Sequence, residues 1–470
     1  MSAPFRISID RTAQAPLAVQ IHRGIAAAIR DGRLANGARL PSWRDLAAQL
    51  GVARGTVRVA YEKLADEQLI AGMGAAGTRV IHEGALPKTT ARLPVATPLP
   101  TLFPDFERPP ATFQMGVPAQ DAFPFSLWSR IMARSARAAA AAPVSYPDPR
   151  GHIELRREIA AYLALARGIQ CEPDQVLVTS GYSGALGLIL RALGLDGRKA
   201  WLEDPAFVLT RVALEQARVT ITPVPVDPDG IDVAAGLRLA PDAAFAVVTP
   251  GQQAPLGLTL SLERRLALLD WAQARQAWII EDDYLSELQL RGRAAPALAS
   301  LDRRGRVLHA GTFSKTITPA LRLGFLVVPP QLAARFGDVA AALAPASAVS
   351  IQRAVASFLA EGHYLRHLRR MKRLYAARRD ALASCLTTRI GSGMKIHANG
   401  GLAVLLDLPD TIDDVAVSRQ ALPFGIAPVP LSPWYSGARR AGLLLGVTNV
   451  DPRRIASDCD RLLALVAAHG

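Results

Sequence analysis

Apolar residues in the first part of this chain follow the spacing of helices. Residues 17–30 place them every three or four positions, and Trp43–Leu50 and about Ala53–Leu69 repeat the pattern. Ser42 can cap the second of these helices, and Gly51 allows a tight turn into the third. Two helices joined by a short glycine turn predict a helix-turn-helix, a motif that sets its second helix in the major groove of DNA.

The pattern changes after the third helix. Residues 72–81 are rich in glycine and end on apolar positions, so they predict a hairpin that forms the wing of a winged helix. Residues 82–111 contain many prolines and no apolar periodicity, a composition typical of an extended, semi-rigid linker. We therefore expect a winged helix-turn-helix domain over residues 1–81 and a linker over residues 82–111.

Over residues 112–470 short apolar runs alternate with amphipathic stretches. Strands are expected at Gln175–Thr179, Ala244–Thr249, Ala277–Ile280, Val307–Ala310 and Leu323–Val328. Helices such as Gly184–Leu193 and Leu262–Gln273 lie between them. This alternation predicts an α/β domain with a mostly parallel central sheet. We expect a large part over about 112–345 and a small C-terminal part over about 346–470.

The composition is typical of a soluble globular protein. Half of the 470 residues are hydrophobic and a fifth are charged, and no apolar run is long enough to cross a bilayer. Residues 1–6 lack the apolar core of a signal peptide, so we expect a cytoplasmic protein without a membrane partner. The three cysteines form no Cys-x-x-Cys pair, which argues against disulfides and zinc. His363 and His367 have a metal-compatible spacing, but nearby arginines would repel a cation, and we expect no metal site.

The formal net charge of +14 indicates either a polyanionic partner or a basic surface without a specific role. Residues 1–80 hold eleven Lys and Arg against six Asp and Glu, which gives a local net charge of +5. A small basic segment that also contains a helix-turn-helix favours nucleic acid binding.

The helix-turn-helix also carries a specific resemblance. Leu40–Ala47 reads LPSWRDLA and Leu50–Val57 reads LGVARGTV, which resembles the GntR class of winged-helix regulators. The residues that this resemblance implies at double-stranded DNA are Arg44, Arg54, Thr56 and Arg58, with Gly77 and Thr78 in the wing. The chemistry of arginine agrees with this assignment, because its side chain can donate two hydrogen bonds to phosphate oxygens or to a guanine edge.

The strongest chemical signal is the run Gly311–Lys315, GTFSK, which is followed by Arg322. It resembles the cofactor-lysine motif of fold-type I aminotransferases, which bind pyridoxal 5′-phosphate (PLP). Within that group it resembles the MocR regulators, in which a GntR winged helix is fused to an aminotransferase-like domain. The resemblance implies that the Lys315 amine forms a Schiff base with the cofactor aldehyde. Thr312, Ser314 and Arg322 would hold the phosphate, the arginine through a charge-assisted fork.

Further residues match the same family upstream of the lysine. Asp282 would pair with the pyridinium nitrogen of the cofactor, and Tyr284 would pair with its ring hydroxyl. The turn that would cradle the phosphate comprises Gly181, Tyr182 and Ser183. Glycine permits close backbone approach there, and the start of a helix supplies N–H donors. Phe207 is the candidate for stacking on the ring, and an ordinary core phenylalanine would look the same.

Two positions depart from the family pattern. Aminotransferases place an asparagine against the ring oxygen, where this chain has Ala254. Active enzymes also use an arginine to bind the substrate carboxylate, where this chain has Leu444, which offers no such contact. Either Arg439 or Arg440 replaces this arginine, or the ligand is not an ordinary α-amino acid.

The sequence thus favours a transcription regulator whose aminotransferase-like domain senses PLP or an amine or amino-acid-like effector. The resemblance also implies a homodimer, and we assign no catalytic residues. Two alternatives stay open: a working PLP-dependent aminotransferase with an accessory winged helix, and a regulator with an empty aminotransferase-like shell. The missing arginine and the basic N-terminal segment favour the regulator over the enzyme.

Overall fold

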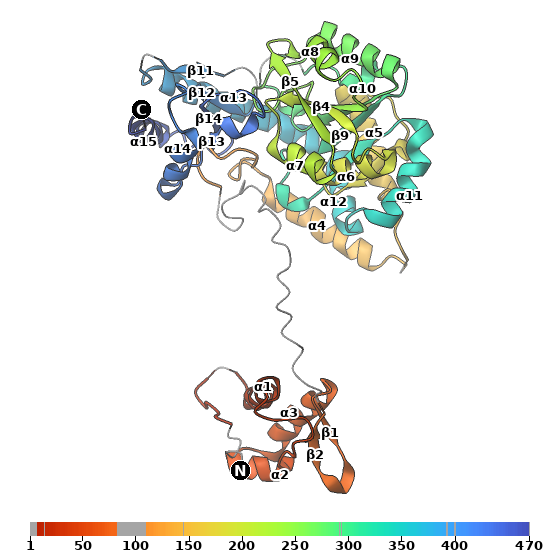
Figure 1. Cartoon of the computed structure of the whole chain (residues 1–470), viewed down its shortest axis with the longest axis vertical. Coiled ribbons are helices and arrows are strands. Elements are labelled where there is room, and N and C mark those ends of the chain that lie inside the picture. Colours follow the sequence, from red (N-terminus) through yellow and green to blue (C-terminus); the bar gives the residue numbers. More distant parts are fainter. Residues whose placement is uncertain are drawn as a thin grey trace. The chain divides into compact units, whose positions relative to one another are not determined.

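The computed structural model describes residues 7–13, 15–81, 110–143, 145–290, 292, 294–391, 393–398 and 401–469. The chain forms two compact units, residues 1–100 and residues 101–470 (Figure 1). Most of the predicted linker, residues 82–109, lies outside the described residues. No described helix is both long and apolar enough to cross a membrane.

The described part of the N-terminal unit combines helices with a two-stranded hairpin. Its elements are α1 (Leu17–Arg30), α2 (Trp43–Leu50), α3 (Arg54–Asp66), β1 (Ile70–Gly72) and β2 (Thr78–Val80). The predicted helices are confirmed, and β1 and β2 form the expected antiparallel hairpin. α3 ends at Asp66, earlier than the sequence indicated, because Gln68 adopts a left-handed conformation (φ 57°) through which a helix cannot continue.

One apolar core holds this unit together. The stripe predicted on α3 comprises Val57, Ala60, Tyr61 and Leu64, all of which are buried against α1 and α2. The Ser42 hydroxyl accepts a hydrogen bond from the Asp45 backbone N–H at 3.1 Å, so Ser42 caps α2 as expected. The Tyr61 hydroxyl donates to the Pro41 carbonyl oxygen at 2.8 Å. The bond from Tyr61 connects α3 to the segment that precedes α2.

An eight-stranded sheet forms the centre of the C-terminal unit, in the order β3-β10-β9-β8-β7-β4-β5-β6. Its strands are β3 (Val176–Thr179), β4 (Lys199–Asp204), β5 (Thr220–Asp227), β6 (Gly230–Ile231), β7 (Phe245–Val248), β8 (Trp278–Asp283), β9 (Val307–Thr312) and β10 (Gly324–Val327). β10 runs antiparallel to both of its neighbours, and β6 runs antiparallel to β5. The strands from β9 to β5 in this order form one parallel series, which confirms the predicted mostly parallel sheet.

Helices cover both faces of this sheet (Figure 1). One face packs against α6 (Tyr182–Leu193), α7 (Val208–Gln216) and α11 (Ala333–Leu343). Another cluster packs the opposite face against α8 (Val233–Leu239) and α9 (Leu262–Arg275). Successive residues of a strand point to opposite faces, so Ile280 of β8 joins the first cluster and Ile279 the second. The C-terminal unit also contains α4 (Phe125–Ala140), α5 (Ile153–Arg167), α10 (Leu298–Leu301) and α12 (Val349–Ala360).

The small C-terminal part contains an antiparallel sheet in the order β11-β12-β14-β13. Its elements are β11 (Lys395–His397), β12 (Ala403–Asp407), β13 (Val429–Pro430), β14 (Gly442–Gly446), α13 (His363–Thr387), α14 (Asp414–Ala421) and α15 (Ile455–Ala467). Leu443 and Leu445 of β14 join the large core that includes α5, α12 and α13. Leu444 points to the other side and joins a separate apolar cluster, which also contains Leu405 of β12.

Buried charged side chains fix the carboxyl end of β8. Arg167 Nε of α5 donates to the Asp283 carboxylate at 2.7 Å, and His309 Nδ1 of β9 lies 3.0 Å from a Glu281 carboxylate oxygen. Burial alone would lower the pKa of His309, but the Glu281 and Asp283 carboxylates raise it above its ordinary value. Glu281 and Asp283 occupy alternate positions on the strand, so Asp282 between them points to the opposite face.

Replacing Arg167 by leucine would remove the cation paired with Asp283 in the interior. We expect Arg167→Leu to lower the free energy of unfolding by about 3–5 kcal/mol, the usual cost of breaking a buried ion pair. Urea denaturation followed by tryptophan fluorescence measures the change. Arg157 is exposed on the same helix, and the control Arg157→Leu should change the free energy by less than about 0.5 kcal/mol. Equal losses in the two variants would contradict a role for the buried pair.

Candidate functional site

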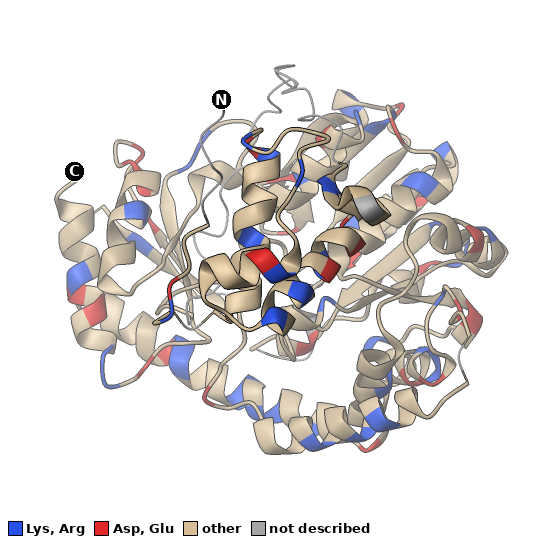
Figure 2. Ribbon diagram, turned by 90° about the horizontal axis from the view of Figure 1, so that it is seen from below, with Lys and Arg blue, Asp and Glu red and all other residues tan. Residues whose placement is uncertain are grey.

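The predicted DNA-contacting residues of the helix-turn-helix lie mostly on its solvent side. Arg44 on α2 is exposed, as is Arg54, the first residue of α3. Arg58 is also exposed and forms an ion pair with Glu62 at 3.4 Å, whereas Thr56 is half-buried. Lys and Arg recur along the helices of the molecule in Figure 2, in keeping with the net charge of +14. Helices α2 and α3 therefore offer guanidinium groups that can reach a polyanion.

An arginine that the sequence analysis did not identify lies beside the wing, in the segment before α2. Gly77 adopts φ 82°, and a side chain placed there would come within 3.1 Å of Arg39 Nε. The backbone of Arg39 pairs with Arg79 of β2, and the Leu40 N–H donates to the Thr78 carbonyl oxygen at 2.9 Å. Arg39 therefore lies beside the predicted wing residues. No strand pattern marks this short pairing in the sequence.

In the C-terminal unit, strand ends meet where the sequence predicts the cofactor lysine. Gly324 of β10 pairs with Thr179 at the end of β3 and with Thr312 at the end of β9. The residues that follow β3 and those that follow β9 therefore emerge at one edge of the sheet. A side chain at position 324 would lie 2.6 Å from the Gly311 carbonyl oxygen and 2.9 Å from Gly181 Cα, so this approach requires glycine.

The predicted phosphate-binding residues gather at this edge. The Ser314 N–H donates to Thr312 Oγ1 at 3.1 Å, and Arg322 Nη2 donates to the Ser180 carbonyl oxygen at 3.2 Å. Gly181 lies at the start of the 12-residue helix α6, and a side chain there would meet open space. Hydroxyls, a guanidinium and the first N–H groups of a helix are the donors that a phosphate requires.

Lys315 lies at the same edge, shortly after β9. Its Nζ donates to the Gly116 carbonyl oxygen at 3.1 Å. Burial lowers the pKa of this amine; the nearby Asp282 carboxylate opposes the change, and Arg322 adds to it. The lower pKa enlarges the fraction of neutral amine, which is the form that attacks an aldehyde.

Asp282 is buried at the end of β8 and close enough to Lys315 to influence its pKa. Burial raises the pKa of the Asp282 carboxyl well above its ordinary value, and the carboxylates of Asp283 and Glu203 raise it further. Asp282 Oδ1 has no hydrogen-bond partner among the described residues. A buried oxygen without a partner is costly, and a protonated ring nitrogen would supply the missing donor. On this observation the residues present fit PLP.

The other predicted cofactor residues are distributed around this edge. Tyr284 and Phe207 both pack against the apolar cluster that contains Leu444. Burial raises the pKa of the Tyr284 hydroxyl, so this group stays protonated and can donate. The Tyr182 hydroxyl lies 3.0 Å from Thr210 Oγ1 of α7. Ser183 is exposed in the first turn of α6.

Both arginines that were considered as replacements for a carboxylate-binding arginine are bonded elsewhere. Arg439 is exposed and donates to Ser432 Oγ at 3.2 Å, and Arg440 is exposed and pairs with Asp407. Leu444 itself is fully buried. Neither guanidinium therefore occupies the position of the arginine that binds the substrate carboxylate in active enzymes.

Glu203 of β4 is a buried group near the site that the sequence analysis did not identify. Its carboxylate accepts hydrogen bonds from Thr249 N at 3.1 Å and from Thr249 Oγ1 at 2.5 Å, and Gln253 Nε2 lies 3.4 Å away. Burial raises the pKa of Glu203 to about 7, although these hydrogen bonds oppose the shift. Its bonding partners follow 46 and 50 positions later in the chain, so no local pattern could reveal them.

The raised pKa of Glu203 predicts a pH-dependent stability. The folded protein holds this proton more tightly than the unfolded chain, so wild-type stability falls as pH rises towards and through about 7. Glu203→Gln cannot ionise and should gain up to about 3 kcal/mol relative to wild type between pH 5 and pH 8. Urea denaturation at the two pH values measures this difference. The exposed control Glu215→Gln should follow the wild type, and a Glu203→Gln difference that is the same at both pH values would refute the prediction.

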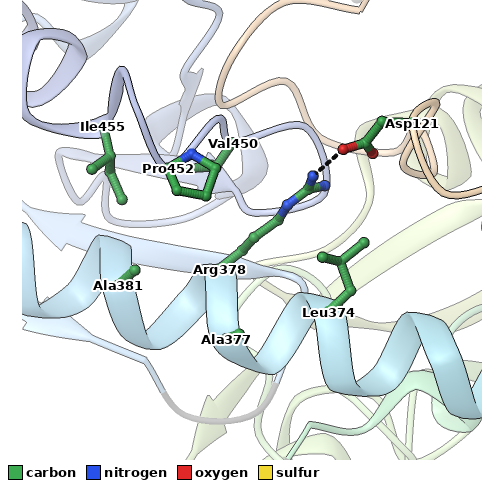
Figure 3. A pocket seen from close by; sticks show the side chains of 8 residues that line it. All are labelled: Asp121, Leu374, Ala377, Arg378, Ala381, Val450, Pro452 and Ile455. Carbon is green, nitrogen blue, oxygen red and sulfur yellow. Dashed lines mark hydrogen bonds and ion pairs between the residues drawn. The ribbon is translucent and has the colours of Figure 1, made fainter.

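Residues 110–124, hereafter the arm, connect the lysine to the small part. The Gly116 carbonyl oxygen accepts the bond from Lys315, and the Val117 carbonyl oxygen accepts one from Thr448 Oγ1 at 2.6 Å. Asp121 forms an ion pair with Arg378 of α13 beside a pocket of about 330 Å³ (Figure 3). The arm therefore follows the linker in the chain and also contacts the predicted cofactor amine.

Together these features define a class of protein. An N-terminal winged helix is followed by an α/β unit whose sheet places a lysine, a buried aspartate and phosphate-type donors near one edge. Such a chain combines a DNA-binding domain with an aminotransferase-like domain.

Comparisons with known proteins agree with this description. Residues 17–80 match the family of bacterial regulatory proteins named gntR, and residues 122–433 match aminotransferase class I and II. The fold is similar to the crystal structure of an archaeal alanine:glyoxylate aminotransferase, with a TM-score of 0.71 and 24% identity over 77% of this chain and 92% of that one.

Two curated relatives cover nearly the whole chain. The probable rhizopine catabolism regulatory protein MocR of Rhizobium meliloti is 34% identical over 97% of this chain and 94% of its own length. The pyridoxine biosynthesis transcriptional regulator PdxR of Corynebacterium glutamicum is 33% identical over 93% of each chain. The chain belongs to the MocR subfamily of GntR transcriptional regulators. It is a DNA-binding regulator with an aminotransferase-like domain, and PLP is the cofactor of that fold family.

Proposed function

We propose that this regulator holds PLP at the edge formed by β3, β9 and β10, and that PLP, alone or with an amine ligand, alters DNA binding by the winged helix. The observation that carries the proposal is Asp282 Oδ1, which has no hydrogen-bond partner in the described part of the chain and lies near the amine of Lys315. A buried acid and a lysine of lowered pKa, close to phosphate-type donors, form a site for a pyridine ring that bears an aldehyde and a phosphate.

Each residue has a distinct task in this proposal. Lys315 presents its neutral amine, and Asp282 Oδ1 holds the proton of the ring nitrogen. The Tyr284 hydroxyl donates to the ring oxygen, and Phe207 stacks on the ring. The residues that hold the phosphate are Thr312, Ser314, Arg322 and the first turn of α6 from Gly181. The cofactor supplies an aldehyde that combines with amines and a ring that withdraws electrons.

The names of the relatives support a sensor of PLP or of an amine. One relative is named as a regulator of pyridoxine biosynthesis, which supports a PLP-related effector for this chain as well. Another is named for rhizopine catabolism, so the effector can differ between members of the subfamily. At the DNA, we propose that Arg44, Arg54, Thr56 and Arg58 of the helix-turn-helix make contacts together with Gly77 and Thr78 of the wing.

The lysine provides the first test. Wild-type protein supplied with PLP should acquire the visible absorption of a PLP–lysine Schiff base, and Lys315→Ala should lose this band completely. The control Lys395→Ala removes an exposed lysine of β11 and should retain the band. The proposal would be refuted if the wild type showed no Schiff-base absorption band, or if Lys315→Ala retained that band.

The winged helix provides the second test. Arg54→Ala should weaken binding to a duplex from the region upstream of the protein's own gene by about 1–3 kcal/mol if Arg54 contacts a base. Fluorescence anisotropy at several salt concentrations measures the affinity. The control Arg33→Ala removes an exposed arginine that pairs with Asp31 at 3.2 Å, and it should leave the affinity nearly unchanged. Comparable losses in both variants would argue against a specific contact from Arg54.

A second candidate function is a working aminotransferase, which the aminotransferase-like fold favours. Ala254 and Leu444 weigh against it, because neither can make the polar contact found in active enzymes. Transamination of an amino acid with a keto acid acceptor at about 1 s⁻¹ or faster, an ordinary enzymatic rate, would replace the regulator-only proposal.

A further inference from the structure

The pocket beside the arm brings a buried cation together with apolar side chains (Figure 3). Its volume of about 330 Å³ lies at the lower end of the usual range for small-molecule sites. The apolar residues that line it are Leu374, Ala377 and Ala381 of α13, and Val450, Pro452 and Ile455 at the start of α15 or just before it. Arg378 and Asp121 are the charged residues of the lining.

Arg378 is the buried member of this ion pair. Its side chain is 7% exposed, and its Nη1 donates to the Thr448 carbonyl oxygen. Its Nη2 donates to Asp121 Oδ2, whereas its Nε has no hydrogen-bond partner among the described residues. Nε and Nη2 lie on one edge of the planar guanidinium and can together bind both oxygens of a carboxylate. Asp121 therefore occupies only half of this edge and leaves a buried N–H unpaired, which is unfavourable.

Asp121 can leave the ion pair at little cost. Its side chain is 65% exposed, so its carboxylate can turn into water without losing hydration. The arm stays attached by other bonds. The Val117 carbonyl oxygen accepts a hydrogen bond from Thr448 Oγ1 at 2.6 Å, and the Ala119 N–H donates to the Tyr375 hydroxyl at 2.9 Å. The pocket therefore keeps its walls when Asp121 turns away.

We propose that this pocket is a second ligand site, which takes a small organic monocarboxylate with an apolar body. The carboxylate replaces Asp121 and pairs with Nε and Nη2 of Arg378, and the body lies against the apolar lining. Burial of the hydrocarbon favours binding, and the guanidinium selects a carboxylate over an uncharged group of the same shape. The proposed PLP site takes no part in this binding.

Phenylacetate and phenylacetamide test the class of ligand, because they share an apolar ring and differ in charge. Each is titrated by isothermal calorimetry into the full-length wild-type protein, with and without added PLP. We expect phenylacetate to bind at least about tenfold more tightly, as a charge-assisted pair of hydrogen bonds implies. Its affinity should be the same in Lys315→Ala and should not depend on PLP, because the pocket lining does not include the predicted cofactor residues.

Substitutions at the pocket test where the ligand lies. Asp121→Asn removes the competing carboxylate, so phenylacetate should bind about threefold more tightly. The control Asp380→Asn removes an exposed carboxylate of α13 that pairs with Arg379 outside the pocket lining, and it should leave the affinity unchanged. Arg378→Leu should weaken binding at least about tenfold. Ala381→Phe should also weaken it, because a ring at this exposed position fills the pocket and leaves the bonds of Arg378 in place.

Several results would overturn the second ligand site. They are equal affinities for phenylacetate and phenylacetamide, no binding of phenylacetate at millimolar concentrations, or binding that PLP abolishes. Phenylacetate binding that Asp121→Asn and Ala381→Phe both leave unchanged would also overturn it. If Arg378→Leu does not fold, these two variants decide, because neither removes the buried guanidinium. A protein that binds phenylacetate as expected and shows no Schiff-base band would refute the proposed PLP site alone.

Discussion

The ion pair between Arg167 and Asp283 holds the strand end on which the rest of the site depends. It ties α5 to β8 across a buried distance of 2.7 Å, and the contact between His309 and Glu281 ties β8 to β9. With both contacts on one face of the sheet, strand alternation turns Asp282 to the other face, the side on which it influences Lys315. This network thus determines the face of the sheet to which Asp282 points.

The predicted cofactor site combines groups of different physical character. Hydroxyls, Arg322 and the start of α6 offer donors to a phosphate, while burial shifts both Asp282 and Lys315 towards their neutral forms. Beside them, Phe207 and Tyr284 pack against a buried apolar cluster that contains Leu444. Polar groups can fix a phosphate, and the packed cluster holds the aromatic side chains in place.

Local patterns in the sequence predicted most elements of the fold, because periodicity and caps act over a few residues. Lys315 and the other cofactor residues were instead predicted from a family resemblance, which began at the compact motif Gly311–Lys315. Contacts between segments that are distant in the chain produce no local pattern in the sequence. The hydrogen-bond partners of Glu203 lie 46 and 50 positions later in the chain. Arg39 forms a β-bridge with Arg79 of the wing. The Gly116 carbonyl oxygen accepts a hydrogen bond from Lys315, although Gly116 precedes it by 199 positions. The end of α3 was misplaced because a left-handed Gln68 has no signature of the kind that glycine gives.

Strand β14 contributes alternate residues to two apolar clusters. Leu443 and Leu445 belong to the large core, whereas Leu444 points away from it and is buried in a second cluster with Val208 and Ala254. This second cluster joins strand β14 to segments that precede the lysine in the chain. A substitution at position 444 therefore acts on this junction and leaves the other two leucines of the strand in place. In evolutionary terms, the packing of one part of the domain against another can change by a single substitution without rebuilding the main core.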